Sequence, residues 1–491
     1  MRSRATRTRR AATAPRRRPL NTGAVFWLEQ AIAGEAGAVA CPPLAGAASA
    51  DVCVVGGGYT GLWTALELVE EAPDARVVVL EAGACGFGAS GRNGGWMTSW
   101  VDELDGLADR FGEEQALWLA DESSATIGRI EAFIGEHGID CHFRRGGGLW
   151  VASSAAQVAI VGHAIATAAR LGRGHLIKAV SAEEITARAG TRAALSGASI
   201  EDSAAVQPAL LARALRRVAL ERGIRIFEGS PMIRLERTRP ATVVTPAGRV
   251  EAGEVVLAAN AWSAQVRELR RTVAVVGSQI VLTEPIPDRL RDLDWAQRGT
   301  LLGDARLFVH YAQVTRDGRI AFGRGGGALG LASRVVPKHF YDPATAASVA
   351  ADFRRWFPQL ARVRLTHAWG GAVDRAPGHL PFVGALGDHS NVHYALGYSG
   401  NGVGPSALIG RILARRALGA NDEYATCALA GGPPGYLPPE PLRFAGGALV
   451  RGAVRRAEER EEAGRDAGPP GRLAKRLVTF SLPPLRRRPP A

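Results

Sequence analysis

Three glycines at fixed spacing, followed by an acid, mark a place where this chain could hold an anion. Gly56, Gly58 and Gly61 lie in one short run, and Glu81 follows 25 residues after the first of them. Gly56 permits a sharp turn, Gly58 has no Cβ to keep a pyrophosphate from the backbone, and Gly61 allows close packing of a helix on a strand. Glu81 is placed to accept hydrogen bonds from a ribose 2′-OH. This chemistry is dinucleotide binding, and the carboxylate favours FAD or NAD over NADP because it repels a 2′-phosphate.

The elements that must position these residues follow from the apolar pattern. Residues 51–55 are predicted to form a short buried strand, residues 59–71 a helix with one apolar face, and residues 76–80 a second strand. The glycines therefore lie where a strand turns into a helix, whose N-terminus offers N–H groups and a positive dipole end to the pyrophosphate. The ordered set of elements is more specific than a glycine turn alone, but it does not identify the dinucleotide.

A second run of small and hydrogen-bonding residues, 86–96, follows at once. An NAD-binding fold would normally continue with an ordinary loop and helix here, whereas this run would let the backbone pass under an extended cofactor. The alternative is a flexible glycine loop. At this point the sequence resembles the D-amino-acid oxidase-like superfamily of FAD-dependent oxidoreductases. The motif Gly-Ala-Ser-Gly-Arg-Asn-Gly-Gly at residues 88–95 is similar to the motif of the branch that includes gamma-glutamylputrescine oxidase.

Further motifs carry the resemblance in the family's order, from Phe26 to beyond Leu442. They are residues 204–211, 223–232, 255–263, 369–374 with 379–384, and 398–403. The resemblance implies that the strand ending at Met232 contacts adenine through its backbone and that residues 398–403 close around the isoalloxazine ring. It implies that FAD is bound by Gly56, Gly58, Tyr59, Thr60, Gly61, Glu81, Ala82, Ser90, Gly91, Arg92, Asn93, Gly94, Gly95, Met232, Ala258, Gly400, Asn401, Gly402 and Val403.

The expected fold class is α/β, with a Rossmann-type FAD-binding domain and a discontinuous, mixed α+β substrate domain. The FAD-binding domain is expected to comprise residues 21–105, 201–270 and 366–425, and the substrate domain residues 106–200 and 271–365. A strand is predicted at 148–152, and a hairpin joins 307–314 to 319–322 through a turn at Arg316-Asp317-Gly318. Residues 430–491 are a Pro/Gly-rich C-terminal extension with one charged helix near 447–463 that packs on the body.

Composition excludes several classes of protein. There is no apolar run of eighteen or more residues, so no transmembrane segment is expected. The five cysteines lack CxxC pairing, which argues against a disulfide framework or a metal site and fits a cytoplasmic protein. The formal charge is +13, but residues 1–18 hold eight arginines and residues 481–491 three, so the body carries only +2. We therefore expect residues 1–20 to be a disordered basic tail and no nucleic acid to be bound.

Flavin chemistry suggests the reaction and the residues on the substrate side. Flavin N5 accepts a hydride from the carbon beside a neutral amine nitrogen, and the imine product hydrolyses in water. The partners are then an amine or amino-acid substrate and oxygen or another electron acceptor. His310 and Tyr311 are the candidate catalytic residues; they alternate on one strand, so only one can face the flavin. Trp96 and Trp369 could wall the pocket, although core packing explains such aromatic residues equally well. Asp374 and His379 are expected to brace a loop.

The closing helix and the flavin linkage are the remaining expectations. Residues 403–418 are predicted to form a helix whose N-terminus stabilises the negative charge of reduced flavin. Covalent linkage in relatives uses a late cysteine or an early histidine, and neither motif contains one here, so the FAD is expected to be noncovalent. Of the three lysines, Lys475 lies in the C-terminal extension, Lys178 lies far from any flavin-binding motif, and Lys338 lies in the expected substrate domain in what reads as a loop. Oxygen reactivity is therefore not expected to depend on a lysine. Two alternatives stay open: a flavoenzyme acting on a hydroxy acid or polyol, and a protein that uses its arginine tails to anchor.

Overall fold

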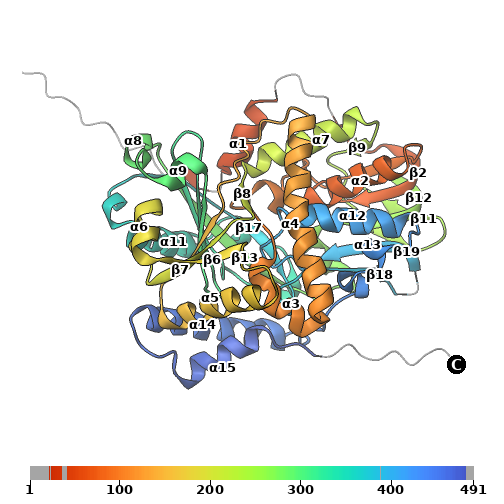
Figure 1. Ribbon diagram of the computed structural model, residues 1–491. Coiled ribbons are helices and arrows are strands. Elements are labelled where there is room, and N and C mark those ends of the chain that lie inside the picture. The colour runs from red at the N-terminus through yellow and green to blue at the C-terminus, as the bar shows by residue number, and fades with distance from the viewer. Residues whose placement is uncertain (1–20, 23, 36–40, 388, 483–491) are drawn as a thin grey trace, which may run out of the picture.

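The structure is a computed structural model that describes residues 21–22, 24–35, 41–387 and 389–482. The basic tail predicted at 1–20 and the last nine residues lie outside the described residues. Two large sheets and one two-stranded ribbon form the framework (Figure 1), with helices packed on their outer faces. The ribbon pairs β4 (Trp96–Thr98) with β8 (Ser203–Ala205).

The eight-stranded sheet contains the dinucleotide-type turn. Buried valines lie in its neighbouring parallel strands β3, β2 and β12, and β9 pairs with β3 at one edge. Its strands are β2 (Gly46–Val55), β3 (Val77–Leu80), β9 (Arg225–Phe227), β10 (Arg234–Glu236), β11 (Ala241–Val244), β12 (Gly248–Leu257), β18 (Phe382–Leu386) and β19 (His389–Leu396). Residues from distant parts of the chain therefore meet on either side of β2.

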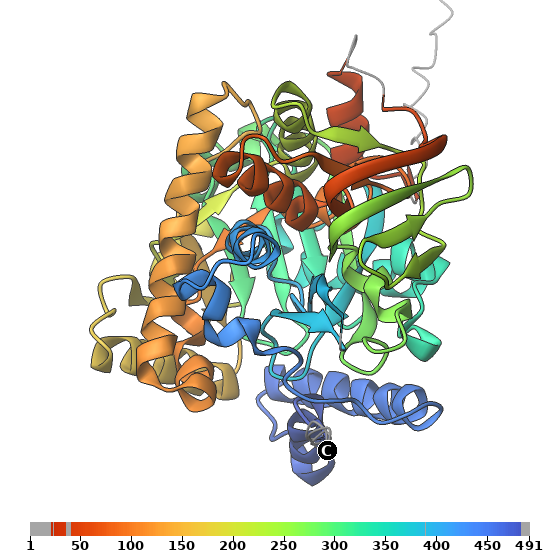
Figure 2. The ribbon, with the colours of Figure 1, turned by 90° about the vertical axis from the view of Figure 1, so that its right-hand side faces the viewer.

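Three helices cover one face of this sheet. They are α2 (Tyr59–Glu71), α7 (Pro208–Glu221) and α12 (Pro405–Ala417). Figure 2 shows the blue α12 beside the red α2, although the two are separated by more than 300 residues. A glycine permits the contact, because a Cβ at Gly410 would lie 2.7 Å from the Cβ of Trp63. The parallel strands, crossover helix and glycine turn confirm the predicted Rossmann-type domain.

The nine-stranded sheet forms the second layer and is mixed. Its strand order is β1-β17-β13-β16-β15-β14-β5-β7-β6. The strands are β1 (Asn21–Thr22), β5 (Gly148–Ala152), β6 (Ile177–Ser181), β7 (Ser196–Ile200), β13 (Ala274–Thr283), β14 (Leu301–Asp304), β15 (His310–Val314), β16 (Ile320–Arg324) and β17 (Leu365–Arg375). Here the chain differs from the expected division, since β17 begins the segment 366–425 but pairs with β13 in this sheet.

The remaining helices surround the nine-stranded sheet and the cavity. The helices are α1 (Phe26–Ala33), α3 (Leu104–Phe111), α4 (Glu113–Glu136), α5 (Ala155–Arg170), α6 (Ala182–Ala189), α8 (Pro287–Leu290), α9 (Asp294–Arg298), α10 (Pro337–Phe340), α11 (Pro343–Trp356), α13 (Glu423–Thr426), α14 (Leu442–Glu462) and α15 (Gly468–Val478). Among the described residues, no helix combines the length and apolar character needed to cross a membrane.

Most predicted elements are confirmed, and two differ. The helix at 59–71, the strand at 148–152 and the hairpin of β15 and β16 are present as expected. Lys338 does not lie in a loop but in α10, which Pro337 can begin because its missing N–H is not needed in a first turn. The extension contains a second helix, α15, that packs against the predicted one, α14 (Figure 1).

Candidate active site

A cavity of about 1450 Å³ opens between the two sheets. It exceeds the ~300–1,000 Å³ of ordinary small-molecule sites, so it has room for a dinucleotide and a substrate together. The predicted site residues that line it are Gly56, Gly58, Tyr59, Thr60, Glu81, Ala82, Ser90, Arg92, Asn93, Gly94, Met232, Ala258, Tyr311, Gly400, Asn401, Gly402 and Val403. Gly61, Gly91, Gly95 and His310 are not part of its lining.

The three glycines outside the lining are packing positions. A Cβ at Gly61 would collide with the carbonyl oxygen of Gly56, and one at Gly91 with that of Gly86. A Cβ at Gly95 would meet the carbonyl oxygen of Val206 and the side chain of Gln313. These glycines shape the cavity walls by letting backbone segments approach, which is the role predicted for Gly61.

The turn after β2 needs the glycine at position 56 and is held by the carboxylate of Glu81. Gly56 has φ +117°, a left-handed conformation that favours glycine, and its Cβ would lie 2.6 Å from the carbonyl oxygen of Ala258. The Glu81 carboxylate accepts hydrogen bonds from the N–H of Gly57 at 2.7 Å and of Gly83 at 2.8 Å. Burial raises the pKa of Glu81. Glu81 thus fixes the turn, and it also lines the cavity.

The second glycine run lies against the start of α2. Ser90 Oγ accepts a hydrogen bond from the Tyr59 N–H at 2.9 Å. The Asn93 carboxamide stays within the run, donating to the carbonyl oxygen of Ser90 and accepting from the N–H of Gly95. Burial lowers the pKa of Arg92 to about 10, and its guanidinium lies 4.5 Å from the ring centre of Phe87.

Two tryptophans hold this run in place. Trp27 Nε1 donates to the carbonyl oxygen of Asn93 at 3.0 Å, and Trp369 Nε1 donates to that of Arg92 at 2.9 Å. The two rings pack edge to face with centroids 5.9 Å apart. Trp369 is fully buried and does not line the cavity, so its expected place in the pocket wall is not observed. The role of Trp27 was missed, because α1 carried no motif of its own.

The closing loop joins the site from the far end of the chain. The hydroxyl groups of Thr60 in α2 and Tyr398 are 2.6 Å apart. Residues 400–403 lie between Tyr398 and α12, whose first residue is Pro405 rather than Val403. Asp374 accepts a hydrogen bond from the N–H of Gly397, and burial raises its pKa to about 6. Asp374 therefore braces the loop, as its position in the late motif suggested.

Tyr311 is the predicted substrate-side residue that reaches the cavity. Its hydroxyl lies 2.7 Å from Ser278 Oγ. A Cβ at Gly94 would lie 2.6 Å from its ring, so the ring packs directly over the glycine run. Burial raises the pKa of Tyr311 to about 12, which keeps the phenol neutral and able to donate. Trp96 also lines the cavity and donates from Nε1 to the carbonyl oxygen of Ala312 at 3.3 Å.

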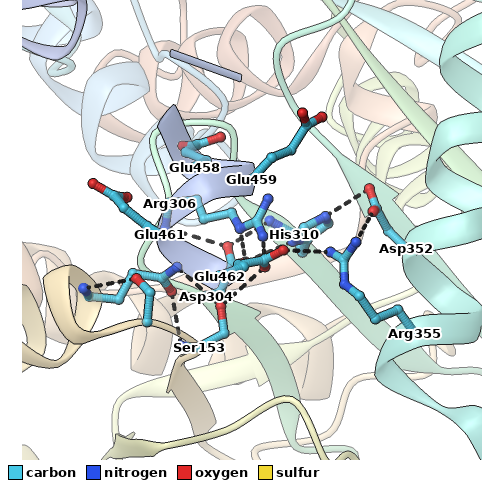
Figure 3. A network of polar contacts seen from close by, with 12 residues as sticks. Ser153, Asp304, Arg306, His310, Asp352, Arg355, Glu458, Glu459, Glu461 and Glu462 are labelled. Carbon is cyan, nitrogen blue, oxygen red and sulfur yellow. Dashed lines mark hydrogen bonds and ion pairs between the residues drawn. The ribbon is translucent and has the colours of Figure 1, made fainter. Parts of the chain in front are cut away.

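His310 points away from the cavity, so the structure does not support a catalytic role for it. Its Nδ1 lies 2.7 Å from Asp304 Oδ2, and its Nε2 lies 3.0 Å from Asp352 Oδ2 (Figure 3). Both ring nitrogens therefore face carboxylate oxygens. The alternation of β15 places Tyr311 toward the cavity and His310 toward α11, where a buried, satisfied histidine was the predicted alternative.

Several charged residues of the cavity wall were not predicted. Asp102 and Glu103 lie in the short turn Val101–Glu103 after β4, and Arg375 ends β17. Arg375 Nη2 lies 2.6 Å from His379 Nε2, and burial together with Arg375 lowers the pKa of His379 to about 3. Glu458 and Glu461 of α14 and Lys475 and Arg476 of α15 also line the cavity. The charge and the helical period of residues 430–491 predict a helix there. They do not show that this helix reaches a cavity formed by other segments of the chain.

The lining fits FAD on observations of this chain. A glycine cradle that side chains would fill lies beside Glu81 at one end, and the loop 400–403 lies at the other. Asn260 Oδ1 and Ser263 Oγ are buried without a hydrogen-bond partner among the described residues, and both residues line the cavity. Such orphaned groups are expected where an absent polar ligand completes the hydrogen bonding.

Comparisons with known proteins identify the family. Residues 51–416 match the model of the FAD dependent oxidoreductase (DAO) family. The gamma-glutamylputrescine oxidoreductase of Escherichia coli (strain K12) is 33% identical over 384 residues, 76% of this chain and 85% of that protein. The probable oxidoreductase OrdL of Haemophilus influenzae is 28% identical over 395 residues, 78% of this chain and 86% of that protein.

Solved structures share the fold. Glycine oxidase from Geobacillus kaustophilus has a TM-score of 0.63 at 21% identity, covering 78% of this chain and 99% of that one. L-proline dehydrogenase from P. horikoshii has a TM-score of 0.62 at 18% identity, covering 79% of this chain and 96% of that one. These structures confirm the fold. The family match over residues 51–416 and the 33% identity to the E. coli relative confirm the predicted resemblance and the FAD requirement, and the chain belongs to the DAO family of FAD-dependent oxidoreductases.

Proposed function

We propose that this enzyme oxidises a C–N bond of an amine or amino acid. A hydride leaves the carbon beside the nitrogen, one N–H proton leaves to solvent, and the resulting imine hydrolyses to a carbonyl compound and an amine. Bound FAD supplies the hydride acceptor, and oxygen or another acceptor then takes its electrons. The observation that carries the proposal is the lining of the cavity, which includes more than the glycine cradle. Tyr311, Trp96, Asp102, Glu103 and Glu458 also line it, and the part of the cavity that they line is called the chamber.

The chain's own residues would bind and orient the substrate. The neutral hydroxyl of Tyr311, held by Ser278, is a fixed group that can hydrogen-bond a substrate nitrogen or carboxylate. Trp96 limits how the substrate lies, since its ring packs where a Cβ of Gly303 would be. Asp102 and Glu103 line the cavity, and burial raises the pKa of both, that of Asp102 to about 7. A cationic or amine-bearing ligand stabilises their charged forms and is therefore favoured over an uncharged polyol. The E. coli relative and the glycine oxidase neighbour are both named for nitrogen-containing substrates, which supports the proposal.

Anaerobic mixing of the purified yellow protein with panels of amines, amino acids, hydroxy acids and polyols tests the proposal. We expect the flavin absorbance to bleach with at least one amine or amino acid and not with the oxygen-only compounds. Bleaching by a hydroxy acid or polyol alone would replace this proposal with the alternative that the same fold oxidises a C–O bond.

A further inference from the structure

The C-terminal hairpin of α14 and α15 contributes to the cavity although the family match ends at residue 416. Glu458 and Glu461 of α14 and Lys475 and Arg476 of α15 are part of the wall. The hairpin lies beneath α5 and the nine-stranded sheet in Figure 1. This part of the chamber therefore belongs to the chain's own extension rather than to the segment that defines the family.

The hairpin is fixed to the body by an ion-pair network. Glu462 pairs with Arg306 and, through Oε2, with Arg355 at 3.1 Å (Figure 3). Arg306 also lies 3.3 Å from Asp304. Glu458 precedes Glu462 by one helical turn, so the two side chains lie on the same face of α14. Anchoring at Glu462 thus holds Glu458 in the chamber wall.

Glu458 is buried, and one of its two carboxylate oxygens has no hydrogen-bond partner among the described residues. It is 2% exposed, and its Oε1 accepts a hydrogen bond from the N–H of Phe308 at 3.3 Å. Its Oε2 is buried and has no hydrogen-bond partner among residues 41–387 and 389–482. A buried, unpaired carboxylate oxygen is costly unless a ligand completes its hydrogen bonding. Because Glu458 lines the cavity, a bound ligand can do so.

The charges around Glu458 favour a cation. Arg306 also attracts Glu458, but it is shared with Asp304 and Glu462, and Lys475 Nζ is 2.6 Å from Glu461. Arg375 is shared, since Glu103 and Glu458 both attract its guanidinium. The unpartnered Oδ1 of Asp102 adds a further carboxylate oxygen to the wall. Burial raises the pKa of Glu458, a cost that a cationic ligand would offset.

We infer that Glu458 determines specificity by accepting a hydrogen bond from a second ammonium group of the substrate. The inference rests on the proposed amine oxidation and narrows it to amines that carry a positive group besides the nitrogen that is oxidised. A substrate with a neutral tail would leave Glu458 Oε2 unpaired and would bind more weakly.

Matched ligands and matched variants of the FAD-loaded enzyme test this inference. The probes are 1,4-diaminobutane, 1,6-diaminohexane and 1,8-diaminooctane, each compared with the monoamine of the same chain length. Binding is measured by anaerobic titration calorimetry and, separately, by flavin bleaching. Glu458→Gln removes the charge and keeps the shape. Glu459→Gln is the control, because Glu459 does not line the cavity and pairs with Arg455 at 3.1 Å.

We expect the wild type to bind at least one diamine more tightly than its monoamine. Glu458→Gln should reduce that preference by about tenfold or more, as expected when a buried charge pair is broken, and leave monoamine binding unchanged. Glu459→Gln should behave as the wild type. An unchanged preference in Glu458→Gln, or no preference at any chain length in the wild type, overturns the inference.

Two further outcomes separate this inference from the proposed function. If diamines bind through Glu458 but no amine bleaches the flavin, amine oxidation fails while recognition of a second ammonium stands. If Glu458→Gln does not retain FAD, the same binding comparison is made with Glu458→Asp. This variant keeps the negative charge but has a side chain one methylene shorter. Selective weakening of diamine binding in that variant supports the inference, and equal effects on both ligand classes overturn it.

Discussion

The Ser90 hydroxyl accepts a hydrogen bond from the Tyr59 N–H at 2.9 Å, which joins the second glycine run to the first turn of α2. The helix N-terminus expected to receive a pyrophosphate thus has one of its N–H groups already engaged. Gly58, the residue before Tyr59, has its missing Cβ directed at the same hydroxyl, at 2.9 Å. The cradle is therefore made by two segments together, and each can be tested through the other.

Gly58→Val should lose FAD, because the side chain blocks the approach of the pyrophosphate and displaces Ser90. Flavin absorbance per polypeptide measures the loss. Gly106→Ala in α3 is the control, since a Cβ there meets nothing within 4 Å. Gly58→Ala with and without Ser90→Ala separates the two causes: recovery in the double variant identifies the serine contact, and continued loss identifies the pyrophosphate. Full FAD content in Gly58→Val would contradict the assignment of the loop.

Glu81→Ala should weaken FAD binding by at least about tenfold, since hydrogen bonds to a charged group contribute about 1.5–3 kcal/mol each. The substitution removes the acceptor for Gly57 and Gly83 as well as the group facing the ribose. Titration of the apoprotein with FAD measures the change. Glu70→Ala, at an exposed position later in α2, should bind FAD as the wild type does.

The FAD should be released by acid precipitation, with the yellow colour in the supernatant. The glycine run 86–95 contains no histidine and residues 369–384 contain no cysteine. The nearest thiol in sequence, Cys85, is fully buried and outside the cavity lining, and burial raises its pKa, which keeps it an unreactive thiol. Colour that stays in the pellet would show a covalent bond.

Reoxidation of the reduced flavin by air should not depend on a lysine. Lys338 is exposed on α10 and does not line the cavity. Lys475 does line the cavity, but Glu461 accepts hydrogen bonds from its ammonium through both carboxylate oxygens and cancels its charge. Lys475→Met and Lys338→Met should both reoxidise within about twofold of the wild type, because no uncompensated positive charge is removed. A collapse confined to Lys475→Met would make Lys475 the oxygen site.

Asp352→Asn should destabilise the protein at neutral pH by about 3 kcal/mol, the scale for breaking a buried ion pair. Burial alone would raise the pKa of Asp352, but His310, Arg324 and Arg355 lower it below its ordinary value of 3.8. The carboxylate therefore stabilises the fold above pH 3.8, and this contribution is lost as pH falls through the depressed pKa.

Thermal unfolding measured over a range of pH tests the direction in which the stabilisation by Asp352 changes with pH. The difference between wild type and Asp352→Asn should be full at neutral pH and shrink on the acid side of pH 3.8. Asp288→Asn is the control, because its carboxylate is 85% exposed and its pair with Arg291 lies at the surface. A constant difference at all pH values would mean that the charge of Asp352 is not what stabilises α11.

Local signals were sufficient for the cradle and insufficient for the chamber. The glycine spacing and the apolar period of residues 59–71 predicted the turn and α2 with the observed bounds, because both depend on neighbours in the chain. The alternation of β15 predicted opposite faces for His310 and Tyr311 but not which face met the cavity, since that depends on α11 packing behind the strand.

Contacts between distant segments carried no local signature. Trp27 reaches Asn93 across 66 positions, and Glu458 reaches Phe308 across 150. Neither residue is unusual in its own helix. Trp27 is a buried aromatic residue of α1, and Glu458 is one of many charged residues of α14. Only the folded arrangement shows that one fixes the glycine run and the other enters the chamber.

The pairing of Thr60 with Tyr398 has a consequence for how the enzyme is made. A chain still being synthesised that has not yet reached residue 369 has its glycine turn but lacks the loop that closes on it and the strand β19 that pairs with β12. It also lacks Trp369, which holds the second glycine run. The cofactor therefore meets a finished site only after nearly the whole polypeptide has left the ribosome. The glycine turn lies near the start of the chain, but the contacts that complete its surroundings come from residues near the end.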